Sequence, residues 1–211
     1  MRTELPVADR LRDDILEGAF PPGERLIELQ LTERYGVGRA AIRAALVELD
    51  AEGLVQREAN RGATVRRISV AEAVEITEAR AALERLIAGR AARHATAVDR
   101  VELLGIVADM RAAVAGNDAA RYSELNRTLH CRLREISRHE TAADLVHNLR
   151  NRAVSHQYRL AMMPGRSVES LEQHAAIVDA VVAGDESAAA DAMDAHLGSV
   201  LDVLSRWGDV Q

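Results

Sequence analysis

Hydrophobic residues recur at helical spacing through most of the chain, and short polar breaks divide it into segments. In the first third, this pattern predicts three short helices. They cover Val7–Glu17, Leu29–Tyr35 and Arg39–Glu52. Ile42, Leu46 and Leu49 form an apolar stripe along the third segment, which would hold that helix against its own domain. The second and third segments, joined by a tight glycine-containing turn, predict a helix-turn-helix.

Two short runs after this motif have the composition of strands. Leu54–Arg57 and Ala63–Arg66 flank the loop Glu58–Gly62, whose Asn and Gly can adopt positive φ. We therefore expect a β-hairpin at this point. Three helices followed by a hairpin wing predict a winged helix-turn-helix domain in residues 1–67.

The rest of the chain shows only helical periodicity. Ser69 and Glu72 have the spacing of a capping box, which begins a long helix that continues to about His94. Five more helical segments follow: Thr96–Ala115, Asp118–Ser137, Thr141–Met162, Val168–Ala183 and Ser187–Trp207. Six helices with short connections predict an antiparallel all-α bundle in residues 68–211. The expected fold class is mainly α, in two domains.

Charge and composition narrow the class of protein. The net charge of −6 argues against a protein that coats nucleic acid generally, yet residues 34–67 hold seven arginines against four carboxylates. A local basic face of this kind suits a module that reads one nucleic-acid site. Cys131 is the only cysteine, so no intrachain disulfide is possible and a reducing compartment fits. No apolar run approaches the roughly 18 residues of a membrane helix, and we expect a cytoplasmic protein with no membrane partner.

Arg39 and Arg43 lie one helical turn apart at the start of the third helix. In a helix-turn-helix, this part of the second helix of the motif meets base edges in the major groove. Arginine suits the task because its planar fork pairs with guanine or clamps a phosphate. Taken alone, the two arginines are equally well explained as solvated helix charges. The adjacent wing favours DNA binding.

A second group of polar residues is spread over three helices of the predicted bundle. Asn126 and His130 lie four residues apart and face the same way, while His174 and His196 each stand among apolar neighbours. Such side chains converge only in the interior of a bundle. Three imidazoles and one oxygen donor can bind Zn²⁺, Ni²⁺ or Mn²⁺ with positions left open for water or an anion. The alternative is that each histidine is a hydrogen-bonded core residue.

The N-terminal residues resemble the winged-helix domain of the GntR family of bacterial transcription regulators. The matching segments are Pro22–Leu26, Tyr35–Arg39, Ile42–Leu46, Leu49, Glu52–Val55 and Asn60–Gly62. The chain departs from the family at Gly38, where Ser or Thr is usual, and at Ala40 and Ala41, where Thr-Pro is frequent. The missing hydroxyls would otherwise cap the recognition helix and contact phosphate. These departures bear on operator sequence and affinity.

The bundle in turn resembles the FCD effector domain of the FadR-like subfamily. The matching segments are Asn126–His130, Glu172–Ile177, Ala183–Asp185, Ala189 and Met193–Leu197. The resemblance implies a divalent metal ion, zinc first with nickel or manganese as the other candidates. Its ligands would be Asn126, His130, His174 and His196, although the neutral Asn replaces a frequent Asp. A small organic acid is the implied effector.

Two arginines are candidates for binding the acid. Arg80 matches a recurrent family arginine on the first bundle helix, and its fork suits a carboxylate. A salt bridge with Glu84 or another acid is an equally open explanation of Arg80. Arg150 is a second candidate, placed by periodicity alone.

The expected function is a ligand-responsive transcription regulator, a repressor, that binds a two-fold symmetric operator in double-stranded DNA as a homodimer. The expected DNA-binding residues are Arg34, Arg39, Arg43, Asn60, Arg61 and Gly62. Two alternatives stay open: a metal-dependent enzyme whose bundle holds the active site, and a direct sensor of the metal ion. No sequence pattern of a nucleophile with its base favours the enzyme, and we expect a protein that is not one.

Overall fold

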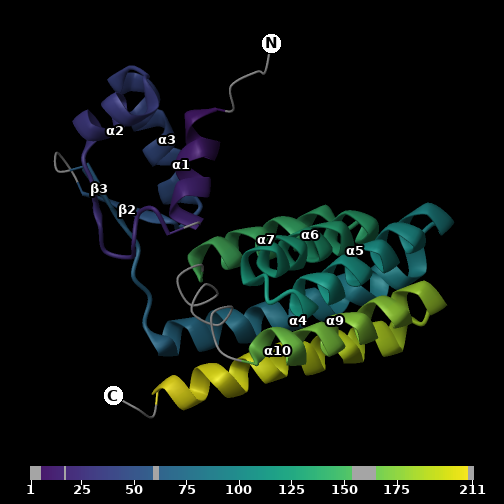
Figure 1. Ribbon diagram of the computed structural model, residues 1–211. Coiled ribbons are helices and arrows are strands. Elements are labelled where there is room, and N and C mark those ends of the chain that lie inside the picture. Colours follow the sequence, from purple (N-terminus) through teal and green to yellow (C-terminus); the bar gives the residue numbers. More distant parts are fainter. Residues whose placement is uncertain (1–5, 17, 59–61, 154–164, 209–211) are drawn as a thin grey trace. The chain divides into compact units, whose positions relative to one another are not determined.

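The computed structural model describes residues 6–16, 18–58, 62–153 and 165–208. The chain forms two compact units, which we describe separately (Figure 1). The elements of the first unit lie within residues 1–69, and those of the second begin at Val70. Arg150–Arg152, at the end of one helix of the second unit, are grouped with the first.

The N-terminal unit consists of three helices and a small sheet. In chain order its elements are α1 (Val7–Leu16), β1 (Arg25–Leu26), α2 (Glu28–Tyr35), α3 (Arg39–Ala51), β2 (Val55–Glu58) and β3 (Gly62–Val65). The strands pair antiparallel in the order β1-β3-β2. The predicted three helices and hairpin wing are confirmed. β1 was not predicted, because two residues are too few to show a strand period.

The apolar stripe of α3 forms the centre of this unit. Ile42 and Leu49 are completely buried and Leu46 nearly so, and they pack with Leu11 of α1 and Val65 of β3 in one cluster. The turn before α3 depends on Gly36, whose φ of 67° is left-handed and whose N–H closes α2 on the carbonyl of Thr32. The front of α3 is thereby left outside the packed region.

The second unit is entirely helical among its described residues. It contains α4 (Val70–His94), α5 (Ala97–Ala115), α6 (Ala119–Ser137), α7 (Glu140–Arg152), α9 (Arg166–Ala183) and α10 (Glu186–Gly208). Thr96 and Asp99 form a capping box at the start of α5, and the Asp118 side chain caps α6. The predicted helix Thr141–Met162 was too long, since α7 ends at Arg152; residues 154–162 of that prediction lie outside the described part.

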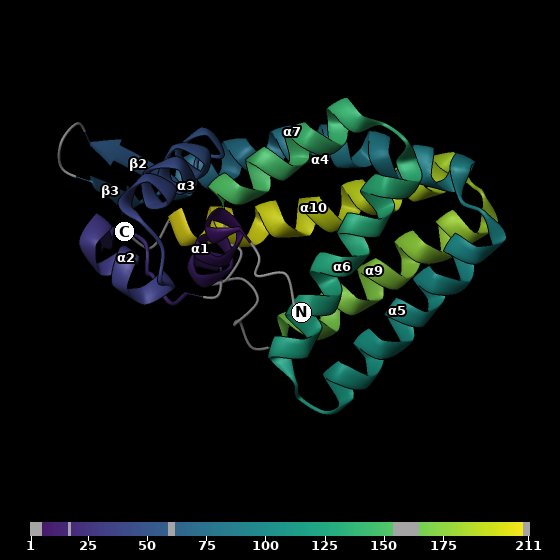
Figure 2. The same ribbon diagram turned by 90° about the horizontal axis from the view of Figure 1, so that it is seen from above.

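α4 and α10 lie side by side and antiparallel in the helical unit (Figure 2). Ion pairs fix this register, because Arg85 contacts Asp191 and Arg93 contacts Glu186. α9 packs against α10, α4 and α5, while α6 packs against α4 and α5.

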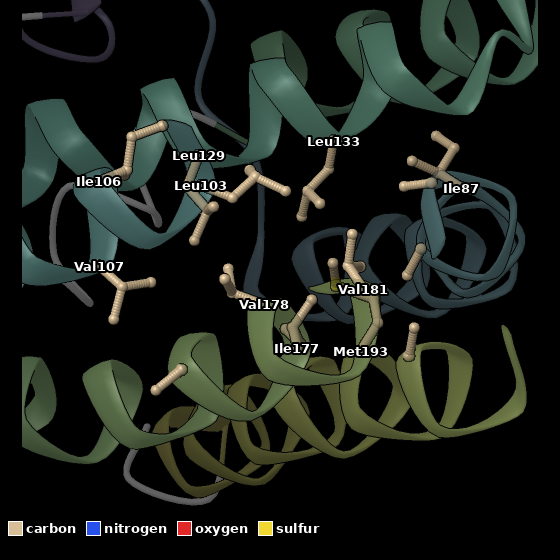
Figure 3. Packing of buried hydrophobic residues seen from close by; sticks show 14 of the residues in the cluster. Ile87, Leu103, Ile106, Val107, Leu129, Leu133, Ile177, Val178, Val181 and Met193 are labelled. Carbon is tan, nitrogen blue, oxygen red and sulfur yellow. The ribbon is translucent and has the colours of Figure 1, made fainter. Parts of the chain in front are cut away.

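Aliphatic side chains from these helices fill the centre of the unit. Figure 3 shows Ile87 of α4, Leu103 of α5 and Leu129 of α6 turned toward Ile177 of α9 and Met193 of α10. None of the helices in the described ranges is long and apolar enough to cross a membrane.

Candidate metal centre and DNA-reading surface

The front of α3 presents two exposed arginines. Arg39 is the first residue of the helix, and Arg43 follows one turn later with 63 % of its side chain exposed. The Nε of Arg43 donates to both carboxylate oxygens of Glu28 on α2, at 3.0 and 2.9 Å. Arg43 is therefore accessible, and a DNA contact through Nε requires it to leave Glu28.

Arg34, the third arginine proposed for DNA, is held within its own unit. Its Nη2 lies 2.9 Å from Asp14 Oδ2 of α1. Its guanidinium carbon lies 4.6 Å from the centre of the Phe20 ring, a cation–π contact. These contacts give Arg34 a structural role, and its contact with DNA stays a prediction.

The two strands of the wing each lie one residue from their predicted bounds, so that Glu58 and Gly62, predicted as loop residues, belong to the strands. Gly62 starts β3 with φ of 87° and pairs with Glu58. A Cβ at Gly62 would lie 2.8 Å from the carbonyl oxygen of Leu26, so glycine is needed for the close approach of β1. Asn60 and Arg61, the other proposed wing contacts, lie outside the described residues.

In the helical unit, the three histidines singled out from the sequence come together. His130 of α6, His174 of α9 and His196 of α10 are all buried, with 3 %, 0 % and 5 % exposed. One ring nitrogen from each lies within 4.8 Å of the other two. The Nε2 atoms of His130 and His174 are 3.3 Å apart.

Each of the three rings is held by its Nδ1 atom. His130 Nδ1 lies 2.9 Å from Glu84 Oε2 of α4, and His196 Nδ1 lies 2.9 Å from Gln173 Oε1. Because those oxygens only accept, each of these Nδ1 atoms carries the proton. The lone pair of the ring is then on Nε2, which is the arrangement that metal-binding histidines show.

The third ring, His174, has hydroxyls beside its Nδ1. Tyr122 Oη lies at 3.3 Å and Ser170 Oγ at 3.4 Å. A hydroxyl can donate or accept, so His174 can take either tautomer. Without a metal, its Nε2–H can donate to His130; with a metal, Nδ1–H donates to a hydroxyl and Nε2 becomes a ligand.

Asn126, the fourth residue predicted to bind the metal, lies on α6. Its Oδ1 atom is buried and has no hydrogen-bond partner within the described part of the chain. An unpartnered buried amide oxygen is costly unless something occupies it. Asn126 stands one turn before His130 on α6, so this oxygen is on the same helix face as that ligand.

These residues fit a divalent metal ion. Two nitrogen ligands at about 2.0 to 2.1 Å from one ion lie about 2.9 to 3.4 Å from each other, and the 3.3 Å between His130 and His174 falls in that range. Three imidazoles with one amide oxygen form a donor set of intermediate softness, which suits zinc, nickel or manganese.

The electrostatics of the cluster keep the His196 ring neutral. Burial lowers the pKa of His196 well below its usual value, and the nearby His130 adds to this effect. The charges of Arg166 and Arg80 lower the pKa further, while Glu84 opposes them. A neutral imidazole is the form that binds a metal.

Arg80, which was predicted to bind the effector's carboxylate, is buried and already forms a salt bridge. Its Nε and Nη2 donate to Glu84 Oε1 at 2.9 and 2.7 Å. The structure therefore shows the salt bridge with Glu84 that the sequence left open, within α4 itself. Arg150 is half-buried near the end of α7 and is grouped with the N-terminal unit. An effector contact by either arginine stays a prediction.

The residues around the histidines were missed from the sequence. They are Glu84, Tyr122, Arg166, Ser170, Gln173 and Ser199. The sequence did contain a signal for such residues, because polar side chains recur at helical spacing along one face of α4 and of α6. Thr77, Arg80 and Glu84 on α4, and Tyr122, Asn126 and His130 on α6, are the clearest runs.

A winged helix-turn-helix joined to a helical unit with a buried polar cluster defines a ligand-responsive, DNA-binding regulator. The chain belongs to the gntR family of bacterial regulatory proteins: residues 3–65 match that family and residues 75–199 match the FCD domain.

Named relatives agree in class. The chain is 29 % identical to the probable D-xylose utilization operon transcriptional repressor of Paenarthrobacter nicotinovorans, over 94 % of this chain and 89 % of the relative. It is also 29 % identical to the transcriptional repressor RspR of Escherichia coli K12, over 90 % of this chain and 83 % of the relative. Its fold is similar to that of E. coli McbR/YncC, with a TM-score of 0.84, 22 % identity and coverage of 96 % and 97 %.

Proposed function

We propose that this chain is a metal-containing, dimeric transcription repressor whose affinity for its operator is set by a small organic acid. Relatives that match over most of their length are named as transcriptional repressors. The observation that carries the proposed metal centre is the buried convergence of three Nδ1-anchored histidines. Asn126, one helical turn before His130, adds a buried oxygen with no hydrogen-bond partner among the described residues. In this proposal, residues 1–67 form the DNA-binding domain, and residues 68–211 form the domain that binds the effector and dimerises.

DNA reading is assigned to α3 and the wing. Arg39 and Arg43 stand exposed at the front of α3 and have the reach to contact base edges or phosphates. Gly62, with Asn60 and Arg61 before it, would bring the wing to the minor groove or backbone. One such unit reads only a few base pairs, so two-fold pairing supplies the rest of the operator.

Dimerisation through the helical unit is supported by the outer face of α5. Val98 and Val101, opposite the buried side of the same helix, are 75 % and 72 % exposed, and Leu104, on the flank between the two sides, is 44 % exposed. Figure 2 shows α5 at the edge of the helical unit. Exposed apolar side chains gathered on one helix are typical of an interaction surface, and a second copy of the chain would cover them. Sedimentation equilibrium tests this step.

The metal would be held by His130, His174, His196 and Asn126. When bound, it would act as a Lewis acid that attracts the carboxylate of an effector to a position left open by the protein. Glu84, Tyr122 with Ser170, and Gln173 would orient the three rings. Acid binding can change operator affinity only by the difference in its affinity for the two arrangements of the protein.

The test uses DNA from upstream of the protein's own gene in a fluorescence anisotropy titration. Protein stripped by a chelator is compared with protein reloaded with Zn²⁺, each with and without a panel of small organic acids. The proposal predicts binding to this DNA and a shift in the apparent Kd of the metal-loaded protein with at least one acid. An absence of any shift across the panel in the metal-loaded protein contradicts the effector assignment.

A direct metal sensor is the second candidate. Glu84, which holds His130, lies on α4, the helix that begins directly after the N-terminal unit. Metal binding at His130 therefore acts on α4. If Zn²⁺, Ni²⁺ or Mn²⁺ alone changes operator affinity and acids add nothing, the sensor is correct. An enzyme has less support, because both oxygens of Glu84 are engaged and it is not placed as a general base.

A further inference from the structure

The connected polar side chains inside the helical unit extend beyond the residues that would hold a metal ion. Hydrogen bonds lead away from the histidines: Gln173 Oε1 accepts from His196 at 2.9 Å and from Ser199 Oγ at 3.1 Å. Ser199 in turn accepts from Arg166 Nη2 at 3.0 Å. The buried guanidinium of Arg166 is thus connected to His196, a proposed metal ligand, through the side chains of Ser199 and Gln173.

Arg166 differs from the other buried arginine of this region. Arg80 has Glu84 as a buried partner, with side chains 7 % and 3 % exposed and two aligned hydrogen bonds. Arg166 is 8 % exposed, and among the described residues its Nη1 makes no hydrogen bond, although it lies 3.1 Å from Glu169 Oε2. Glu169 is itself 57 % exposed, so water screens this pair and the guanidinium is only partly compensated.

Hydroxyl groups lie along the contacts that lead from this cation to the histidines. Ser199 contacts both Arg166 and Gln173, and Tyr122 and Ser170 contact His174 Nδ1. A buried guanidinium whose Nη1 makes no hydrogen bond among the described residues, with a serine hydroxyl beside it, suits the recognition of a carboxylate or another oxyanion.

We propose that Arg166 binds a second acidic group of the effector, so that the effector is a small acid with two anionic ends. One end would bind at the metal held by the histidines, and the other would bind at Arg166 with support from Ser199 and Tyr122. Glu169 occupies the guanidinium in the absence of ligand and gives way when the acid binds. This inference rests on the proposed acid-responsive function and names the class of acid.

The experiment is isothermal titration of Zn²⁺-loaded protein with α,ω-dicarboxylates of three to six carbons and the monocarboxylates of equal length. We expect at least one dicarboxylate to bind about 10- to 100-fold more tightly than its monocarboxylate, the range of a charged hydrogen bond. Arg166→Gln should abolish this preference and leave monocarboxylate binding unchanged. The matched control is Arg85→Gln, at an exposed arginine on α4.

A second variant keeps the test informative if Arg166→Gln fails to fold. Glu169→Gln removes the internal competitor, so dicarboxylates should bind severalfold more tightly. A merely structural Arg166–Glu169 pair predicts no such gain.

The outcomes separate the two proposals. If monocarboxylates bind as well as dicarboxylates and neither variant changes the preference, the role of Arg166 is overturned while an acid effector stands. If no acid of either series binds the metal-loaded protein, both proposals are overturned.

Discussion

The Nε2 atoms of His130 and His174 face each other across 3.3 Å, from two helices that are far apart in the sequence. Two neutral imidazoles can share one proton at this distance, or both can give their lone pairs to one ion. Glu84 behind His130 holds the proton on Nδ1 and makes Nε2 a stronger base, which suits either state. The contact has the length of a hydrogen bond, and we propose that both Nε2 atoms become ligands when a metal binds.

Glu84→Gln should weaken metal binding by about 10- to 100-fold, the usual cost of losing a carboxylate behind a ligating histidine. Competition of the protein with a Zn²⁺ indicator measures this. Because the substitution also leaves Arg80 as an unpaired buried cation, the double variant Arg80→Gln/Glu84→Gln is needed beside it. Glu124→Gln, an exposed residue on α6, is the control. Equal Zn²⁺ affinity in the folded double variant and the wild type would show that Glu84 does not support the centre.

Arg43→Ala should weaken operator binding by about 1 to 3 kcal/mol if Arg43 contacts a base. Glu28→Gln should act in the opposite direction and strengthen binding up to about fivefold, since it releases Arg43 from an exposed ion pair. Anisotropy titrations against the same DNA measure both. Arg111→Ala, at an exposed arginine on α5, is the control. Weaker binding by the Glu28 variant would mean that the pair orders Arg43 for DNA rather than restraining it.

Gly38→Ser should stabilise the N-terminal unit by about 0.5 kcal/mol. Gly38 is the N-cap of α3 with φ of −72° and no side-chain cap, and an added Cβ meets nothing within 4 Å. A serine hydroxyl there can accept from an amide of the first turn. Urea unfolding measures the change. Gly36→Ala is the matched contrast, because its left-handed φ of 67° makes a side chain costly; equal effects of the two substitutions would contradict this explanation.

Asp99→Ala should destabilise the helical unit by about 1 kcal/mol at pH 7 and by much less in acid. Hydrogen bonds from Thr96 lower the pKa of Asp99, and the charge of Arg132 adds to this effect. A carboxylate with a depressed pKa stabilises the fold above its unfolded pKa of about 3.9, and that contribution disappears as the pH falls through the folded value. Urea unfolding between pH 7 and about 3 measures it, with Asp109→Ala as control. A penalty that persists in acid would refute the ionic cap.

The sequence was sufficient for the elements with a strong period. Ile42, Leu46 and Leu49 identified α3 because one face of that helix is wholly buried. β1 could not be predicted from the sequence pattern of its own two residues. Its pairing with β3 depends on the close approach of the two backbones at Gly62. The end of α7 was also missed, because helical propensity continues beyond Arg152.

For the candidate site, the sequence pointed to histidines but not to what holds them. His130, His174 and His196 were visible as polar residues on apolar faces. Glu84 and Gln173 resembled ordinary helix-surface residues, and only the packing of α4 and α9 against their neighbours turns them toward the rings. Arg80 shows a similar limit. The sequence suggested an arginine that binds the carboxylate of an effector, and in the structure its guanidinium is paired with Glu84 of its own helix.

The most direct test of the account is elemental analysis of purified wild-type protein beside His174→Ala, with circular dichroism to show that both are folded. We predict close to one zinc, nickel or manganese ion per wild-type chain and a large loss of that metal in the variant. Equal metal in both proteins, or none in the wild type after incubation with each ion, would contradict the assigned centre.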